Sequence, residues 1–129
     1  MIPQITGLYA VPLAVIMVAL SAHVIMLRAK TKISLLDGGN TQLNERIRRH
    51  GNFTENVPMV LLLMALAELL GAPGAWLHAT GAILLIGRIV HIPGIRHDDP
   101  AAPARIAGAS ATMLATLMAA GLILSRVIA

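Results

Sequence analysis

The sequence predicts an all-α integral membrane protein, a single-domain bundle of four transmembrane helices. Of its 129 residues, 57% are hydrophobic and only 12% are charged. A soluble domain of this size carries charge on about a quarter of its residues. Four apolar stretches, at about 6–28, 44–70, 75–92 and 101–126, are each long enough to cross a bilayer.

The first apolar stretch is followed, not preceded, by basic residues. Arg28 ends it, and Lys30 and Lys32 come after it. A cleavable signal peptide carries its basic residues before the apolar core. The order found here therefore predicts a retained helix with its N-terminus outside the cytoplasm. The segment Asp37-Gly-Gly-Asn40 then predicts a turn toward the second helix.

Glycine and proline mark the other boundaries. Gly71-Ala-Pro-Gly74 predicts a tight turn between the second and third stretches, and Pro93-Gly94 predicts the end of the third helix. Asp98-Asp99-Pro100 predicts the start of the fourth helix, with an acidic cap and a proline in the first position. Small residues at four-residue spacing in that helix predict close contact with a neighbouring helix. They are Ala104, Gly108, Thr112 and Thr116 and, in a second line, Ala107, Ala111, Ala115 and Ala119.

The positive charge is concentrated in two connections. The net charge is +4, and nearly all Lys and Arg lie in or near the connections between the first and second stretches and between the third and fourth. The positive-inside rule predicts that both connections face the cytoplasm and that both termini lie outside. Basic residues beside apolar runs suit contact with membrane lipid. Because there is no aromatic interleaving for base stacking, we predict no nucleic-acid partner.

The absence of cysteine limits the chemistry. A chain without cysteine has no disulfide, no thiolate metal site and no thiol nucleophile of its own. Any thiol chemistry therefore takes its sulfur from a substrate. No pair of histidines has metal-ligand geometry, and the arginines nearby oppose a bound cation, so no metal site is predicted.

A cluster of polar residues occupies the start of the second helix. On a helix, Arg48, Asn52 and Glu55 share one face, because they are spaced four and three residues apart. Glu45 and Arg49 lie near the edge of that face and suit a surface pair four residues apart. Several arginines with an asparagine and a glutamate suit a ligand that carries carboxylates and an ammonium group, such as a peptide-like zwitterion.

Two apolar helices bring further polar groups to the same depth. Glu55 lies sixteen residues before Gly71, and His91 lies sixteen residues after Ala75. In an antiparallel hairpin, Glu55, Arg88 and His91 would therefore all lie roughly 20 Å from the outer turn. Arg88 is flanked by apolar residues and needs a partner, and Glu55 is the partner we expect. Such a pair fits either a ligand pocket or a purely structural lock in a non-enzymatic membrane protein, a small transporter or a structural bundle.

Two motifs resemble those of a known family. Arg48-x-x-x-Asn52-x-x-Glu55 is followed by Pro58 and an apolar helix, and Arg88-Ile-Val-His91-Ile-Pro-Gly94 ends the third stretch. Together with four spans and a basic first connection, they resemble the MAPEG family, the membrane-associated proteins in eicosanoid and glutathione metabolism. The resemblance covers nearly the whole chain and is greatest to the small bacterial branch.

The resemblance implies a homotrimer of four-helix subunits in the bacterial inner membrane. It implies glutathione as co-substrate, bound between neighbouring subunits near the cytosolic face. The activity implied is that of a microsomal-type glutathione transferase, which conjugates or reduces a lipophilic electrophile. The sequence does not identify that electrophile.

The family motifs also assign site residues. The glutathione-binding residues implied are Arg28, Arg48, His50, Asn52, Glu55, Asn56, Arg88 and His91. His91 and Arg28 are the candidates for catalysis. The chain departs from the eicosanoid enzymes in having His91 and Ile95 where they have tyrosines. The arginine that activates the thiol in those enzymes has no secure match, and Arg96 and Arg105 are the nearby candidates.

Overall fold

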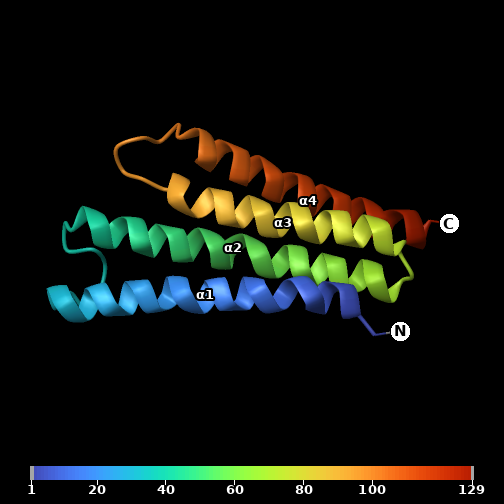
Figure 1. The fold of residues 1–129 in the computed structure, drawn as a ribbon, viewed down its shortest axis with the longest axis horizontal. Helices are drawn as coiled ribbons and strands as arrows, with labels where there is room; N and C mark the ends of the chain where they lie inside the picture. The colour runs from blue at the N-terminus through green and yellow to red at the C-terminus, as the bar shows by residue number, and fades with distance from the viewer. Residues whose placement is uncertain (1, 129) are drawn as a thin grey trace.

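The computed structural model describes residues 2–128 and contains four helices over that range. They are α1 (Gln4–Thr31), α2 (Thr41–Leu69), α3 (Gly74–Gly94) and α4 (Pro103–Val127). The helices lie alongside one another with alternating direction (Figure 1). The α1–α2 and α3–α4 connections meet at one end, the loop end, while the termini and the α2–α3 turn meet at the other, the turn end. The predicted all-α bundle is confirmed.

Three of the four helices are long and apolar enough to cross a membrane by length and composition: α1, α3 and α4. Helix α2 does not meet that criterion, because its first half carries several charges. It nevertheless has 29 residues, or about 43 Å of helix, and lies beside the other three. The chain is therefore an integral membrane bundle whose second helix is polar at the loop end.

The predicted start of the fourth helix is wrong. Helix α4 begins at Pro103, and its N-cap Ala102 offers no side-chain hydrogen bond. Asp99 instead closes a turn before the helix, with its carboxylate accepting from the Ala101 backbone N–H at 3.1 Å. Pro103 takes the first helical position, where its missing N–H costs nothing and its φ angle is already helical.

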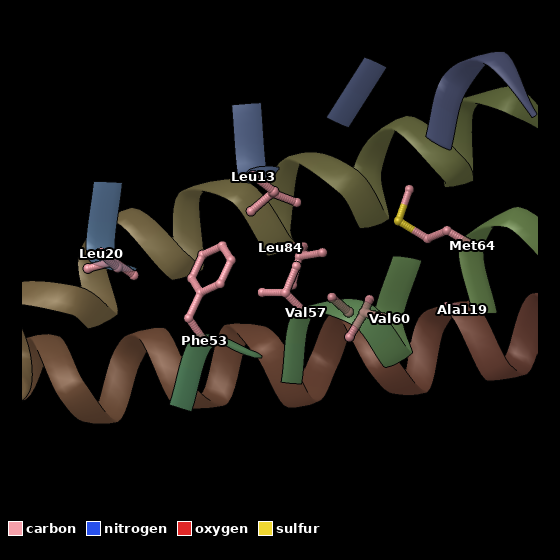
Figure 2. Close-up of a cluster of buried hydrophobic side chains, with 9 residues drawn as sticks. Leu13, Leu20, Phe53, Val57, Val60, Met64, Leu84 and Ala119 are labelled. Carbon is pink, nitrogen blue, oxygen red and sulfur yellow. The ribbon is translucent and has the colours of Figure 1, made fainter. Parts of the chain in front are cut away.

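The core is a column of apolar side chains in which all four helices take part. Helix α2 contributes a stripe at helical spacing, Phe53, Val57, Val60 and Met64, and it faces residues of α1, α3 and α4. Figure 2 shows these side chains pointing toward one another along the bundle. The partners are Leu13 and Leu20 from α1, Leu84 from α3, and Ala115 and Ala119 from α4. In lipid, packing of this kind holds helices together through van der Waals contact.

Helices α3 and α4 approach closely where both carry glycine. A Cβ atom on Gly87 would lie 2.7 Å from the Cβ of Ala111, and one on Gly108 would lie 2.6 Å from the carbonyl oxygen of Gly87. The predicted close contact of the small residues is thereby confirmed. The residues of α4 that are buried are Gly108 and Thr112, from the first predicted line of small residues, and then Ala115 and Ala119, from the second. A helix has 3.6 residues per turn, so a four-residue line drifts around it.

At the turn end, Glu68 of α2 caps the first turn of α1. Its carboxylate accepts from the backbone N–H groups of Ile5 and Thr6 and from the Thr6 hydroxyl, each at 2.8 Å. These N–H groups have no partner inside their own helix, and the N-terminus of a helix favours negative charge. The Glu68 side chain thus satisfies the free backbone N–H groups of the first turn of α1 and fixes the position of α1 relative to α2.

Replacing this carboxylate should destabilise the bundle. We expect Glu68→Gln to lower the free energy of unfolding by about 2–3 kcal/mol, because charged hydrogen bonds are lost and an amide donor faces backbone donors. Thermal unfolding in detergent, followed by circular dichroism, measures the change. Gln4→Ala, at an exposed neighbouring position, is the control and should change stability by less than about 0.5 kcal/mol. Equal melting temperatures for Glu68→Gln and wild type would contradict the capping role.

Candidate functional site

A cavity of about 160 Å³ lies at the loop end, where α2, α3, α4 and the α3–α4 loop meet. Most of its lining is polar, and arginine is the most frequent residue. From the second helix come Asn44, Glu45, Arg48 and Asn52, and from the remainder of the chain come His91, Ile95, Arg96, His97 and Arg105. Three residues predicted from the sequence, Arg48, Asn52 and His91, therefore share this cavity.

The predicted Glu55–Arg88 pair is wrong. Glu55 lies on the exposed side of α2, with its Oε1 atom 3.6 Å from Nη1 of Arg48. Arg88 is 1% exposed and points into the bundle. The two residues stand at similar depth, but depth along a helix does not determine the direction of a side chain around it. A structural lock between Glu55 and Arg88 therefore has no basis within this chain.

Arg88 is instead bound to Asn52. Its Nη2 atom donates to the Asn52 side-chain oxygen at 3.1 Å, and its Nε atom has no hydrogen-bond partner within residues 2–128. An arginine so deeply buried with one neutral partner is expensive in a membrane helix and marks a functional region. Since Arg88 occupies the Asn52 oxygen, the amide nitrogen of Asn52 remains as the donor for a ligand in the cavity.

His91 faces the cavity because α4 offers no side chain behind it. The His91 residue is 3% exposed, and its Cβ would collide with any Cβ placed on Gly108. Arg105 lines the same cavity from the first turns of α4. The sequence could name Arg105 only as a candidate near the site, and the structure brings it to the cavity with Arg48 and His91.

The α3–α4 loop is held against α2 by the pair predicted at its surface. Arg49 and Glu45 form that pair at 3.3 Å, and Arg49 also donates to the Ile95 carbonyl at 2.9 and 3.1 Å. Glu45 accepts from the backbone N–H of His97 at 3.0 Å and lies 2.8 Å from its ring nitrogen Nδ1. The expected surface pair is confirmed, and it also fixes the loop wall of the cavity.

Arg96 has its own counter-ion in this loop. Its guanidinium donates to both carboxylate oxygens of Asp98, at 3.0 and 2.7 Å. This bidentate contact lowers the pKa of the Asp98 carboxyl below its ordinary value. The positive charge of Arg96 is consequently balanced nearby, whereas Arg105 has no ion pair within residues 2–128.

Five predicted residues do not line the cavity of this chain: Glu55 and Arg88, described above, and Arg28, His50 and Asn56. Arg28 donates to the carbonyl oxygens of Ile33 and Leu36 at 3.2 and 2.9 Å and so holds the α1–α2 connection. The Asn56 amide donates to the Asn52 backbone oxygen at 2.8 Å, within its own helix. His50 is half-buried and is not among the cavity residues. A single chain therefore gathers only part of the predicted site.

Comparison with known proteins agrees with this picture. The MAPEG family model matches residues 6–125. The chain belongs to the MAPEG family. Inner membrane protein YecN from Escherichia coli is 36% identical to it over 94 residues, which cover 73% of this chain and 72% of YecN. YecN from a second Escherichia coli strain matches with the same figures. The resemblance to the small bacterial branch is confirmed.

The cavity of this MAPEG protein suits an anion. Three arginines line it against the single carboxylate of Glu45, and Arg96 is balanced by Asp98. Residues 2–128 contain no group of three His, Cys, Asp or Glu side chains placed to hold a metal ion. The cavity is also small, since pockets for organic ligands enclose roughly 300–1,000 Å³. One chain thus offers a cationic part of a site rather than an enclosed pocket.

The Arg88–Asn52 bond can be tested by a double-mutant cycle. We expect Asn52→Leu to lower the free energy of unfolding by about 1–3 kcal/mol, because it leaves the Arg88 guanidinium buried without its partner. In an Arg88→Met background the same change should cost less, since an apolar side chain needs no partner. Denaturant titration of all four proteins in detergent measures the coupling. An equal cost of Asn52→Leu in both backgrounds would show that the two side chains do not interact.

Proposed function

We propose that this MAPEG protein binds glutathione at the loop-end cavity and acts as a glutathione transferase. The observation that carries the proposal is the convergence of Arg48, Asn52, His91 and Arg105 on one cationic cavity. Glutathione is an anionic peptide with two carboxylates, one ammonium group and a thiol. It therefore supplies both the negative charge that the cavity lacks and the thiol that the chain lacks.

The binding groups match those of the ligand. The Arg48 guanidinium can take a carboxylate through two parallel hydrogen bonds, and the Asn52 amide nitrogen adds a further donor. Glu55, 3.6 Å from Arg48, is placed to receive the ammonium group beside the carboxylate. Arg88 does not line the cavity but positions the Asn52 amide through the 3.1 Å hydrogen bond.

Arg105 and His91 are the groups best placed to act on the thiol. A cation near a thiol favours the thiolate and lowers the thiol pKa. Arg105 lines the cavity without a carboxylate partner among residues 2–128, whereas the charge of Arg96 is balanced by Asp98. In this mechanism the thiolate attacks a lipophilic electrophile that arrives from the bilayer. In conjugation, a sulfur–carbon bond forms as the leaving group departs with the electron pair of the bond that breaks. In reduction of a hydroperoxide, the thiolate breaks the O–O bond and releases the alcohol, and a second glutathione converts the resulting sulfenic acid to the disulfide and water.

A neighbouring subunit would complete the pocket. The cavity of one chain, about 160 Å³, is smaller than a typical ligand site, and Arg28, His50 and Asn56 lie outside it. In a homotrimer these residues would come from the next subunit. We place the protein in the bacterial inner membrane, as the name of YecN says of that relative. The basic loop end would face the cytoplasm and the termini the outside.

Glutathione affinity tests the proposed site directly. We expect Arg48→Ala to weaken glutathione binding about tenfold or more, because a charge-assisted hydrogen bond contributes roughly 1.5–3 kcal/mol. Isothermal titration of the detergent-purified protein gives the dissociation constants. Arg126→Ala removes an arginine at the turn end, where it contacts the Gly71 carbonyl, and should leave the affinity unchanged. If wild-type protein shows no saturable binding, or Arg48→Ala binds as tightly, the site assignment is wrong.

The pH dependence of the thiolate tests the role of Arg105. Ultraviolet absorbance of the bound thiolate should appear at a pH below the ordinary thiol pKa of about 8.5. Arg105→Leu removes the cation, so the apparent pKa of bound glutathione should rise toward that value while binding is largely kept. Arg96→Leu is the comparison and should shift the pKa less, because Asp98 already balances Arg96. A larger shift in Arg96→Leu than in Arg105→Leu would reverse the assignment.

A further inference from the structure

A second cavity lies at the loop end between α1, α2 and α3 and encloses about 330 Å³. Its deeper walls are the apolar side chains of Ile16, Leu20 and Ile92, and its rim carries His23, Arg46 and Arg49. Arg49 also donates to Ile95, which lines the first cavity, so this arginine stands between the two. The second cavity is thus distinct from the proposed glutathione site and reaches the size of a ligand pocket.

The rim carries one positive charge without a balancing carboxylate. Arg49 is paired with Glu45 at 3.3 Å. Arg46 donates its Nη1 to the His23 backbone carbonyl at 2.8 Å and forms no ion pair within residues 2–128. The carbonyl takes one N–H of five and leaves the remaining donors of Arg46 for an anion. The rim of the second cavity therefore suits a negatively charged group.

The polar and apolar residues of the second cavity lie at different depths in the bundle. Ile16 lies seven residues before His23 on α1, roughly 10 Å further toward the middle of the bundle. Polar donors consequently stand at the level where α1 ends in basic residues, and apolar side chains continue into the depth of the membrane-spanning segment. A soluble anion would use only the rim. A molecule with an anionic head and a hydrocarbon chain uses the rim and the walls.

We propose that this cavity binds one anionic phospholipid of the surrounding leaflet. The phosphate accepts hydrogen bonds from Arg46, and one acyl chain lies against Ile16 and Leu20. Basic pockets between transmembrane helices bind acidic headgroups in this way. The proposal does not depend on glutathione binding, because none of the residues that it uses lines the first cavity.

Lipid retention tests the proposal. The full chain is reconstituted in nanodiscs of equal parts phosphatidylglycerol and phosphatidylcholine and then released into mild detergent. Native mass spectrometry counts the lipids that stay bound. We expect wild-type protein to retain phosphatidylglycerol in preference to phosphatidylcholine. Arg46→Gln should reduce that preference about fivefold, the factor that corresponds to roughly 1 kcal/mol for one basic residue at an anionic surface.

Two further variants separate the cavity from general surface charge. Ala19→Trp fills the cavity without changing any charge and should also abolish the retained lipid. Lys32→Gln removes a charge at the same end, outside the cavity, and should retain lipid as wild type does. Equal retention in wild type, Arg46→Gln and Ala19→Trp would overturn the proposal. So would an equal loss in Lys32→Gln, or retention of free fatty acid in place of phospholipid.

Discussion

The arginine buried in α3 is the constraint on which the loop half of the bundle depends. Arg88 is 1% exposed within a mostly apolar helix, and among residues 2–128 its one side-chain partner is the Asn52 oxygen at 3.1 Å. A charge in that position is costly unless neighbouring groups stabilise it. The bond fixes the rotation of α2 relative to α3, because Asn52 must face inward. Arg48, one turn earlier on the same face, is thereby directed to the cavity.

The two ends of the bundle are fixed by carboxylates of the same helix. Glu68 caps α1 at the turn end, and Glu45 with Arg49 holds the α3–α4 loop at the other. Helix α2 is therefore the element that the other three are positioned against. Between these ends, glycines 87 and 108 let α3 and α4 approach closely. The missing side chain at Gly108 leaves space for His91, which packs against it and lines the cavity.

The sequence predicted the parts of the structure that depend on local pattern. Apolar length gave the four helices, and the spacing of Arg48 and Asn52 placed both on one face. The sequence-based predictions failed where the position of a side chain depends on rotation about a helix axis or on the path of a loop. Glu55 was expected to pair with Arg88 because of its depth, but Glu55 is exposed beside Arg48 while Arg88 is buried against Asn52, so the pair is not formed. The place of Arg105 depends on how the α3–α4 loop is anchored by Glu45 and Arg49, which no local pattern encodes.

The capping role of Glu68 was equally inaccessible, since its partners lie about sixty residues away on α1. The proposed function likewise depends on contacts between residues that are distant in the sequence. The cationic cavity encloses about 160 Å³. Arg105 lines it without an ion pair within residues 2–128, and Arg28, His50 and Asn56 lie outside it. The three arginines of the cavity, Arg48, Arg96 and Arg105, are exposed in the single chain, and their like charges repel one another. The cavity is therefore either hydrated or filled by a negatively charged ligand, and that negative charge is what the proposed glutathione would supply.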